Sequence, residues 1–308
     1  MAAHVAVSIV GFRNVPDIVR CLRAVGASTY ADYEVIICEN GGEAAHAALV
    51  AALPSALPGG QPVRVVLAPG NLGYAGGVNT CLAETPDVDA WWVLNPDTEP
   101  YPDAMAALVE RLSRGDCEAA GGVLLTPEGT VQSIGGVWRK WMARAVSIGN
   151  GQPAAGPFDQ AMVEARQQYL SGASMMVGRA FVGRVGPLRH DYFLYCEEVE
   201  WCLRGLARGI RLGFAPGARV LHHHGTTTGA GEGARARPRL PVYLDERNRI
   251  LLSRDCFGAA LPVIALGSLV SMLARFGRRR AWRQLGYALD GWWAGVRNLR
   301  GPPPWLKV

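Results

Sequence analysis

The sequence predicts an α/β fold built around a mostly parallel sheet. Four short runs rich in β-branched and aromatic residues are separated by helical patterns of about ten residues: VAVSIV (5–10), EVIIC (34–38), VRVVL (63–67) and AWWVL (90–94). Strands that alternate with helices predict right-handed βαβ units. Polar or glycine-rich loops follow these runs, at the carboxyl edge where open α/β sheets hold their ligands.

Prolines support the helical segments between these strands. Pro16 and Pro102 stand near the starts of the first and fourth helical segments, where proline suits the first turn. After residue 115 the alternation becomes looser. The sequence then predicts a strand at 119–125, an irregular insertion at 138–168, a helix at 196–209 that Gly209 closes, and a strand at 218–225.

The last quarter of the chain differs in composition. Residues 225–239 are glycine-rich and polar, which predicts a loop or linker. Residues 257–274 carry no charge over 18 positions, but Pro262 and Gly267 dilute the run. This length is the lower limit for a spanning helix, so an interfacial or re-entrant segment is an equally good interpretation. We therefore expect a catalytic domain at 1–240 and a helical, membrane-associating region at 241–308.

The end of this region has an amphipathic pattern next to basic residues. Apolar side chains recur at helical spacing at Trp282, Leu285, Leu289, Trp293 and Val296, next to a group of arginines at 278–280 and 283. A basic amphipathic helix of this kind is typical of binding to an anionic bilayer. The alternative is a helix that docks on the core of the protein itself.

The charge distribution argues against a nucleic-acid-binding protein. The net charge is +5, but residues 275–308 contain eight basic side chains and a single acid, Asp290. That segment therefore contributes +7 and the first 274 residues carry −2. Seven scattered cysteines without a C-x-x-C pair, and an N-terminus without a secretory leader pattern, predict reduced thiols in a cytoplasmic protein.

Three groups of residues are candidates for chemistry. Asp97 follows a buried strand by a few residues, so it is either a turn cap or a metal ligand. Glu197, Glu198 and Glu200 open a predicted helix; they either favour its dipole or supply a general base. Residues 222–224 are three consecutive histidines, which suggest a zinc site but lack the usual ligand spacing. The segment NLGYAGGVN (71–79) is a weak phosphate-loop signal.

The order of these motifs resembles a family 2 glycosyltransferase with the GT-A fold. The motifs are SIVGFRN, ENGG, NLGYAGGVN, VLNPDT, QSIGG, YLSGASMMVGR, DYFLYCEEVEWCLRGLARG and VLHHHG. They cover roughly residues 4–250, and within the family they look most like the rhamnosyltransferase branch. The resemblance implies the nucleotide-diphospho-sugar transferase fold, a Rossmann-like and mostly parallel sheet.

The resemblance also implies roles for individual residues. Asp97 would hold a divalent cation, Mg²⁺ or Mn²⁺, together with His222, or with His224 as a fallback. Glu198 would be the catalytic base, with Glu197 and Arg204 as further catalytic residues. The residues implied to bind the nucleotide sugar are Gly11, Phe12, Arg13, Glu39, Asn71, Gly73, Gly76, Asn79, Asn95 and Gly172.

The implied reaction is inverting transfer of a sugar from a nucleoside diphosphate. The rhamnosyltransferase-like pattern implies dTDP-L-rhamnose as donor, with a UDP-sugar as the alternative. The basic tail favours a saccharide acceptor at a membrane, such as a polyprenyl-linked saccharide in cell-surface polysaccharide assembly, and a peripheral location on the inner face of the cell membrane. A zinc-dependent hydrolase that uses the 222–224 histidines and a non-enzymatic sugar-nucleotide sensor are the alternatives from other classes.

Overall fold

The computed structural model describes residues 3–223, 233 and 235–306 and contains a nine-stranded sheet. Its strands lie in the order β3-β2-β1-β4-β10-β6-β11-β5, and β7 pairs with β6. Their bounds are β1 (Val5–Gly11), β2 (Tyr33–Glu39), β3 (Val63–Leu67), β4 (Ala90–Leu94), β5 (Thr98–Pro100), β6 (Ala119–Leu125), β7 (Val131–Ser133), β10 (Ser174–Gly178) and β11 (Leu212–His222). A separate hairpin consists of β8 (Gly136–Arg139) and β9 (Arg144–Ser147).

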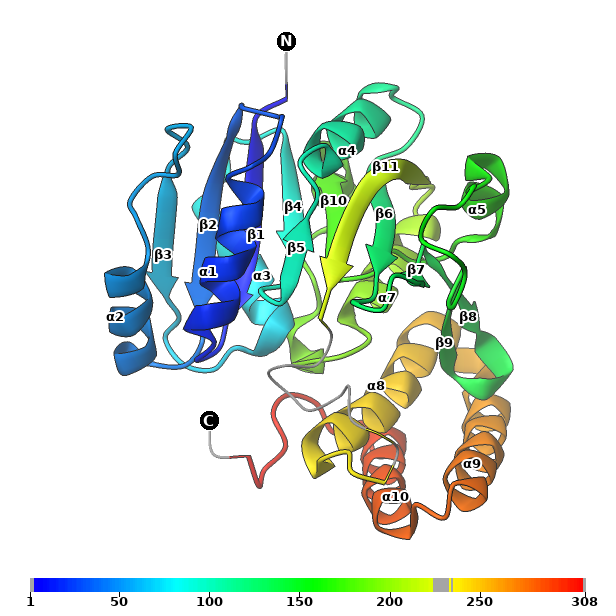
Figure 1. The fold of residues 1–308 in the computed structure, drawn as a ribbon. Coiled ribbons are helices and arrows are strands. Elements are labelled where there is room, and N and C mark those ends of the chain that lie inside the picture. The colour runs from blue at the N-terminus through cyan, green and yellow to red at the C-terminus, as the bar shows by residue number, and fades with distance from the viewer. Residues whose placement is uncertain (1–2, 224–232, 234, 307–308) are drawn as a thin grey trace.

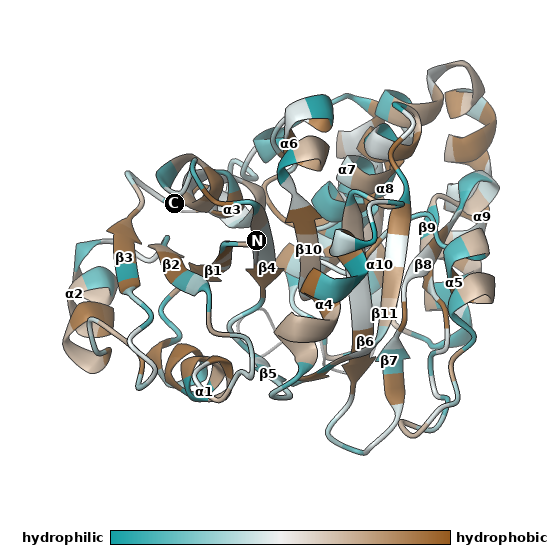
Figure 2. Cartoon of the chain, turned by 90° about the horizontal axis from the view of Figure 1, so that it is seen from above, coloured by the Kyte–Doolittle hydropathy of each residue, from teal (hydrophilic) through white to brown (hydrophobic). Residues whose placement is uncertain are grey.

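Helices cover both faces of the sheet. They are α1 (Val15–Val25), α2 (Glu43–Ala52), α3 (Gly73–Glu84), α4 (Ala104–Ser113), α5 (Gln160–Arg166), α6 (Arg179–Val185), α7 (Glu197–Leu206), α8 (Arg239–Phe257), α9 (Leu261–Arg278) and α10 (Trp282–Val296), with 3-10 turns η1 (Lys140–Met142), η2 (His190–Tyr192) and η3 (Gly258–Ala260). Figure 2 shows α1 and α4 on one side of the sheet and α3 and α6 on the other.

Strand β1 shows why the predicted strands are continuously apolar. Val7 and Ile9 pack in the core formed with α1 and α4, whereas Ala6 and Val10 belong to the core formed with α3. A parallel strand that is covered on both faces needs apolar residues at nearly every position. The four predicted N-terminal strands are all present, parallel and adjacent in the sheet.

Several elements differ from the sequence predictions. The strand predicted at 218–225 begins earlier, at Leu212, and its described part ends at His222. The insertion at 138–168 contains the β8–β9 hairpin and α5. Pro102 lies before α4 rather than in its first turn. Strand β10, which we did not predict, runs antiparallel between β4 and β6.

The C-terminal helices pack together below the end of the sheet where the parallel strands finish (Figure 1). Helix α10 approaches α8 closely because its contact face contains glycines: a Cβ on Gly291 would lie 2.2 Å from the carbonyl oxygen of Tyr243. The amphipathic stripe predicted for α10 is therefore not its docking face. Trp282, Leu289 and Trp293 are exposed, while small residues face α8.

Helix α9 also presents an apolar outer face. Ile264, Met272 and Phe276 are buried against the protein. On the opposite side, Val263, Leu266, Val270 and Leu273 are exposed. The helical run Arg239–Arg278 is long and apolar enough to cross a membrane by length and composition only, and 17% of its apolar window is buried in the structure.

Candidate active site

A cavity of about 620 Å³ opens where the parallel strands of the sheet end. It lies between the loops after β1, β2 and β4, the start of α7 and the first turn of α8. Nine of the residues proposed from the sequence line it: Phe12, Asn71, Gly73, Asn95, Asp97, Gly172, Glu197, Glu198 and His222.

Asp97 and His222 form a close pair in the cavity wall. Oδ1 of Asp97 lies 3.3 Å from Nε2 of His222. Strand pairing holds them there, since His222 is paired with Thr98 and the backbone amide of His223 donates to the carbonyl oxygen of Asp97. Nδ1 of His222 lies 2.7 Å from Oε1 of Gln132, which can only accept, so this nitrogen carries the proton.

This arrangement suits a divalent cation. With the proton on Nδ1, a neutral His222 would present the lone pair of Nε2 close to the carboxylate oxygen of Asp97. Two acceptors at 3.3 Å repel each other unless a proton or a cation lies between them. Carboxylate oxygen and imidazole nitrogen are also ligand types that Mn²⁺ and other divalent ions accept.

The neighbouring histidines do not support a site built on the whole 222–224 run. Nε2 of His223 lies 2.7 Å from Oε1 of Glu99, so the two described imidazoles contact different carboxylates. His224, the fallback ligand, lies outside the described residues. Within the described part of the chain, no group of three or more His, Cys, Asp or Glu side chains is placed to hold a metal ion.

The two acids at the start of α7 follow a strained loop. Phe193, Tyr195 and Cys196 all have positive φ angles, a conformation that L-residues rarely adopt. Asn248 of α8 stabilises this loop, because its Nδ2 lies 2.7 to 3.0 Å from the carbonyl oxygens of Tyr192, Leu194 and Tyr195. Helix α8 therefore fixes where the acids point.

The guanidinium of Arg247 adds to this restraint. It donates to the carbonyl oxygens of Tyr192 and Gly301, and its Nε donates to Oδ1 of Asn248. Arg247 and Asn248 are both buried. A buried backbone carbonyl that loses its donor costs about 1 to 3 kcal/mol, so these two side chains hold the loop strongly.

Burial changes the acidity of the two carboxyl groups. It raises the pKa of Glu198 from 4.5 to about 7, and it raises the pKa of Glu197 well above its ordinary range, with a further contribution from the charge of Glu198. Oε2 of Glu197 is buried without a hydrogen-bond partner among the described residues. A carboxyl group with a pKa near neutrality is suited to accept a proton at physiological pH.

The glycine-rich segment forms another wall of the cavity. Asn40 holds it, because Nδ2 donates to the carbonyl oxygen of Gly73 and Oδ1 accepts from the amide of Leu72. Gly73 has a φ of 70°, and a Cβ there would lie 2.1 Å from the carbonyl oxygen of Phe193. The hydroxyl of Tyr74 donates to the carbonyl oxygen of Gly172 at 2.6 Å.

Glu39 is buried next to the cavity without lining it. Its Oε1 accepts from the backbone amides of Arg13 and Gly41, and Oε2 has no partner among the described residues. A Cβ on Gly11 would lie only 2.4 Å from Oε2, so the carboxylate sits against bare backbone. Arg13, with a φ of 56°, donates through Nε to the carbonyl oxygen of Gly41.

Three other predicted site residues have structural contacts outside the cavity. Arg204 does not line the cavity; it pairs with Glu200 and donates to the carbonyl oxygens of Val185 and Pro187, which gives its guanidinium a structural role. Asn79 exchanges two hydrogen bonds with the backbone of Leu188. A Cβ on Gly76 would lie 2.6 Å from the Cβ of Leu72, so this glycine permits tight packing.

Several cavity residues were not predicted as site residues. Asn40 and Gln132 belong to the ENGG and QSIGG motifs, so motif membership was the available signal. Leu240, Pro241 and Leu306 come from the C-terminal region and add an apolar wall. Their position depends on how the C-terminal helices fold back, which local sequence does not indicate.

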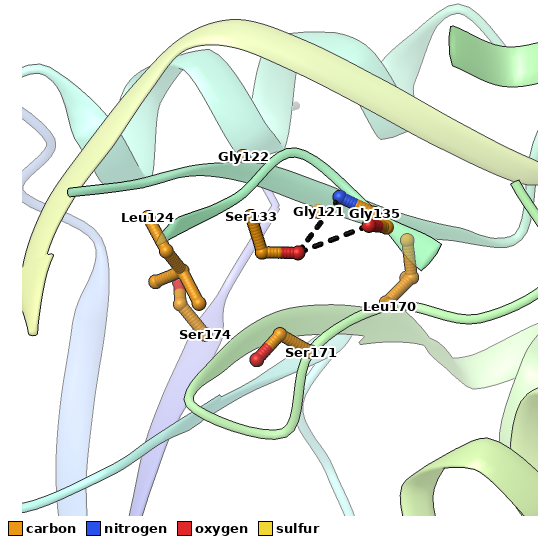
Figure 3. A pocket seen from close by; sticks show the side chains of 8 residues that line it. All are labelled: Gly121, Gly122, Leu124, Ser133, Gly135, Leu170, Ser171 and Ser174. Atoms are coloured by element: carbon orange, nitrogen blue, oxygen red, sulfur yellow. Dashed lines mark hydrogen bonds between the residues drawn. The ribbon is translucent and has the colours of Figure 1, made fainter. Parts of the chain in front are cut away.

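A second, much smaller cavity has a volume of about 10 Å³. Figure 3 shows the side chains that line it. The two cavities share Leu124, Ser133 and Ser171 in their walls. The hydroxyl of Ser133 bridges the carbonyl oxygen and the amide of Gly135, which closes the loop after β7. A space of this size holds at most one water molecule.

Comparison with known proteins decides the family. The profile of glycosyl transferase family 2 matches residues 7–162, about half of the chain. The chain belongs to this family. An N-acetylglucosaminyl-diphospho-decaprenol L-rhamnosyltransferase of Mycobacterium tuberculosis is 28% identical over 234 residues, which is 70% of this chain and 74% of that protein. Rhamnosyltransferase WbbL of Escherichia coli K12 is 29% identical over 89 residues, 28% of this chain and 34% of that protein.

Solved structures confirm the GT-A fold of this family 2 glycosyltransferase. GalNAc-T7, crystallised with UDP, GalNAc and Mn²⁺, superposes with a TM-score of 0.63 at 15% identity, over 82% of this chain and 47% of that chain. The mannosyltransferase PcManGT of Pyrobaculum calidifontis, in complex with GDP-Man and Mn²⁺, gives a TM-score of 0.54 at 14% identity, over 97% of this chain and 88% of that chain. The fold and family expected from the motifs are therefore confirmed.

Proposed function

We propose that this enzyme is an inverting, metal-dependent glycosyltransferase that uses a nucleoside-diphosphate sugar. The observation that carries the proposal is that the Asp97–His222 pair and Glu198 line one cavity. A single displacement needs a group that stabilises the departing diphosphate and a base that accepts the proton of the acceptor hydroxyl. The Asp97–His222 pair suits the first role, and Glu198, with its raised pKa, suits the second.

Asp97 and His222 would hold the cation, and Gln132 would orient the imidazole from behind. A divalent cation bound there supplies positive charge that stabilises the departing nucleoside diphosphate. Glu39 would shape the nucleotide-base end of the donor site from behind the cavity wall, because its Oε1 accepts from the amides of Arg13 and Gly41. Asn71, Gly73 and Asn95 would border the donor along the cavity wall.

Glu198 would accept the proton of the acceptor hydroxyl as its oxygen attacks the anomeric carbon. The new bond to the acceptor oxygen forms on the face opposite the leaving diphosphate, so the configuration inverts. Asn248 and Arg247 contribute by holding the loop that presents this acid.

The relatives support a rhamnosyl donor and a lipid-linked acceptor. The mycobacterial relative is named for transfer of L-rhamnose to a decaprenol-linked acceptor, so dTDP-L-rhamnose is our first choice, ahead of UDP-sugars. The exposed apolar faces of α9 and α10 and the arginines beside them support contact with an anionic membrane surface. We propose that the protein associates peripherally with the inner face of the cell membrane.

A thermal-shift experiment tests the metal and nucleotide assignment. Tm is measured with UDP, dTDP and dTDP-L-rhamnose, each with and without Mn²⁺, for wild type, Asp97→Asn and the control Asp87→Asn. Asp87 is exposed in the loop before β4. We expect Mn²⁺-dependent stabilisation in wild type and in the control, and its loss in Asp97→Asn. Full Mn²⁺-dependent stabilisation in Asp97→Asn would rule out this cation site.

A further inference from the structure

Four arginines from separate segments gather beside the active site. They are Arg144 at the start of β9, Arg249 on α8, Arg275 in the last turn of α9 and Arg279 directly after that helix; the charges of the last three act on Arg144. We call them the arginine cluster. The packing of η1 on α9 brings the segments together, because a Cβ on Gly267 would lie 2.2 Å from the carbonyl oxygen of Trp141. Glu246 joins α8 to α9 by pairing with both Arg249 and Arg275.

The positive charge of this cluster is only partly balanced. Asp245 and Glu246 pair with Arg249, and Glu246 also pairs with Arg275. No hydrogen bond or ion pair of the Arg144 guanidinium is found within the described ranges. Partial desolvation and the charges of Arg249, Arg275 and Arg279 lower the pKa of Arg144, and the charge of Asp245 opposes this effect. Four guanidinium groups thus face two carboxylates, and an anion bound among them would relieve their repulsion.

The cluster lies next to the base end of the cavity. Pro241 of α8 lines the cavity, and Asp245 and Arg249 follow it at four and eight residues along the same helix, so the three side chains share one helix face. Asp245, the partner of Arg249, is close enough to Glu198 that its charge adds to the effect of burial on the pKa of that acid. An anion held by the cluster would therefore lie near the acceptor hydroxyl that Glu198 is proposed to deprotonate.

An apolar surface begins at the same place. Trp141 and Met142 of η1 are exposed, and the exposed side chains of α9 lie beside this turn. A ligand that joins a phosphate group to a hydrocarbon chain matches both surfaces. Free inorganic phosphate would use only the arginines.

We propose that the arginine cluster binds the diphosphate of a lipid-linked acceptor, with the hydrocarbon chain running along η1 and α9. Guanidinium groups bind phosphate oxygens in pairs of charge-assisted hydrogen bonds, which gives both strength and orientation. This inference rests on the proposed transferase function, because it assigns the acceptor side of the same site.

Titration calorimetry with citronellyl diphosphate tests the proposal. The binding is measured in EDTA, below the micelle concentration, so that no metal-bound diphosphate site contributes. Arg144→Gln and Arg279→Gln each remove one exposed member of the cluster. Arg23→Gln on α1 is the control, since it makes the same charge change at an exposed position on another face of the sheet. We expect Kd to rise about tenfold or more in the two cluster variants and to stay within about twofold in the control.

Two further measurements separate this inference from the proposed function. UDP binding with Mn²⁺ should be unchanged in Arg144→Gln and lost in Asp97→Asn. Citronellyl diphosphate binding should instead be weakened in Arg144→Gln and unchanged in Asp97→Asn. Sedimentation with phosphatidylglycerol vesicles should be unchanged in Arg144→Gln. Equal citronellyl diphosphate affinity in wild type and both cluster variants, or an Arg144→Gln effect confined to the vesicles, would overturn the acceptor-diphosphate assignment. Either result would leave the donor site intact.

Discussion

Nε2 of His222 lies 3.3 Å from Oδ1 of Asp97, and Gln132 fixes the proton of the same imidazole on its other nitrogen. The pairing of β11 with β5 sets this geometry through backbone hydrogen bonds. Strand pairing therefore holds the two side chains close together in the cavity wall. Such a pair depends on the residue behind the histidine as much as on the ligands themselves.

Replacing Gln132 with methionine should weaken binding of the cation without removing one of its proposed ligands. The imidazole would lose the acceptor that selects its tautomer, so we expect the Mn²⁺ concentration for half-maximal activity to rise about 10- to 100-fold. Activity at saturating Mn²⁺ should recover most of the wild-type rate. Gln152→Met, an exposed glutamine near the same loop, is the control. Unchanged Mn²⁺ dependence in Gln132→Met would show that the hydrogen bond to Nδ1 has no role in metal binding.

The pH dependence of the reaction should follow Glu198. Burial raises its pKa to about 7, and a general base acts in its deprotonated form. We therefore expect kcat/KM to fall as the pH decreases through about 7 and to level off above it. Glu198→Gln should reduce kcat by at least about 100-fold. A flat profile between about pH 5.5 and 8, or a wild-type rate in Glu198→Gln, would assign the base to another residue.

The N-terminal half of the fold was predictable from the sequence, because there the hydrophobic pattern and the alternation of strands with helices agree. Strands β1, β2 and β4 are parallel neighbours and read as buried apolar runs, whereas β3 is the partly exposed edge strand and is recognisable by its β-branched residues. Strand β10 was missed because it is a five-residue antiparallel segment whose pairing partners, β4 and β6, lie about 50 or more residues earlier in the chain. The apolar stripe on α10 was predicted, but the sequence did not show whether this stripe or another face docks on the protein. The glycine face makes the contact, and the stripe is exposed.

Cavity-lining residues were predictable where they come shortly after a strand or open α7. Asp97 and Glu198 stand in such positions, and both line the cavity. Arg204 stands at helical spacing from the same acids, but its guanidinium is used by the loop at Val185 and Pro187. The motifs could not predict the role of Asn248, because that role depends on α8 folding back onto a loop more than 50 residues earlier in the chain.

Gly73 offers a test of the wall formed by the glycine-rich segment. Alanine there would adopt an unfavourable positive φ and would also place its Cβ 2.1 Å from the carbonyl oxygen of Phe193. We expect Gly73→Ala to lower the free energy of unfolding by about 3 kcal/mol or more, combining roughly 1 kcal/mol of backbone strain with the clash. Urea denaturation measures this change.

Gly209→Ala provides the matched control. Gly209 has a φ of 77°, but a Cβ at this position would have no neighbouring atom within 4 Å, so the substitution isolates the backbone strain. We expect a loss of about 1 kcal/mol for this variant and wild-type activity. Equal losses in the two variants would mean that the contact between Gly73 and Phe193 adjusts without cost.

The outer face of α9 should determine membrane binding. Leu266 and Val270 are exposed on the side opposite the buried Ile264 and Met272, so charged residues at these positions would not disturb the protein core. We expect the double variant Leu266→Glu and Val270→Glu to keep its Tm within about 2 °C and to lose sedimentation with phosphatidylglycerol vesicles, because two carboxylates would enter the apolar and anionic interface.

Point substitutions are preferable to removal of residues 257–308 for this test. Arg300 pairs with Asp191 and Asp255, and the carbonyl oxygen of Gly301 accepts from Arg247, so truncation would also weaken the loop that presents Glu198. Val50→Glu, at an exposed apolar position on α2, is the control and should sediment like wild type. If the α9 double variant still sediments with the vesicles, the protein does not use this face to reach the bilayer, and α10 or the η1 turn must carry the contact.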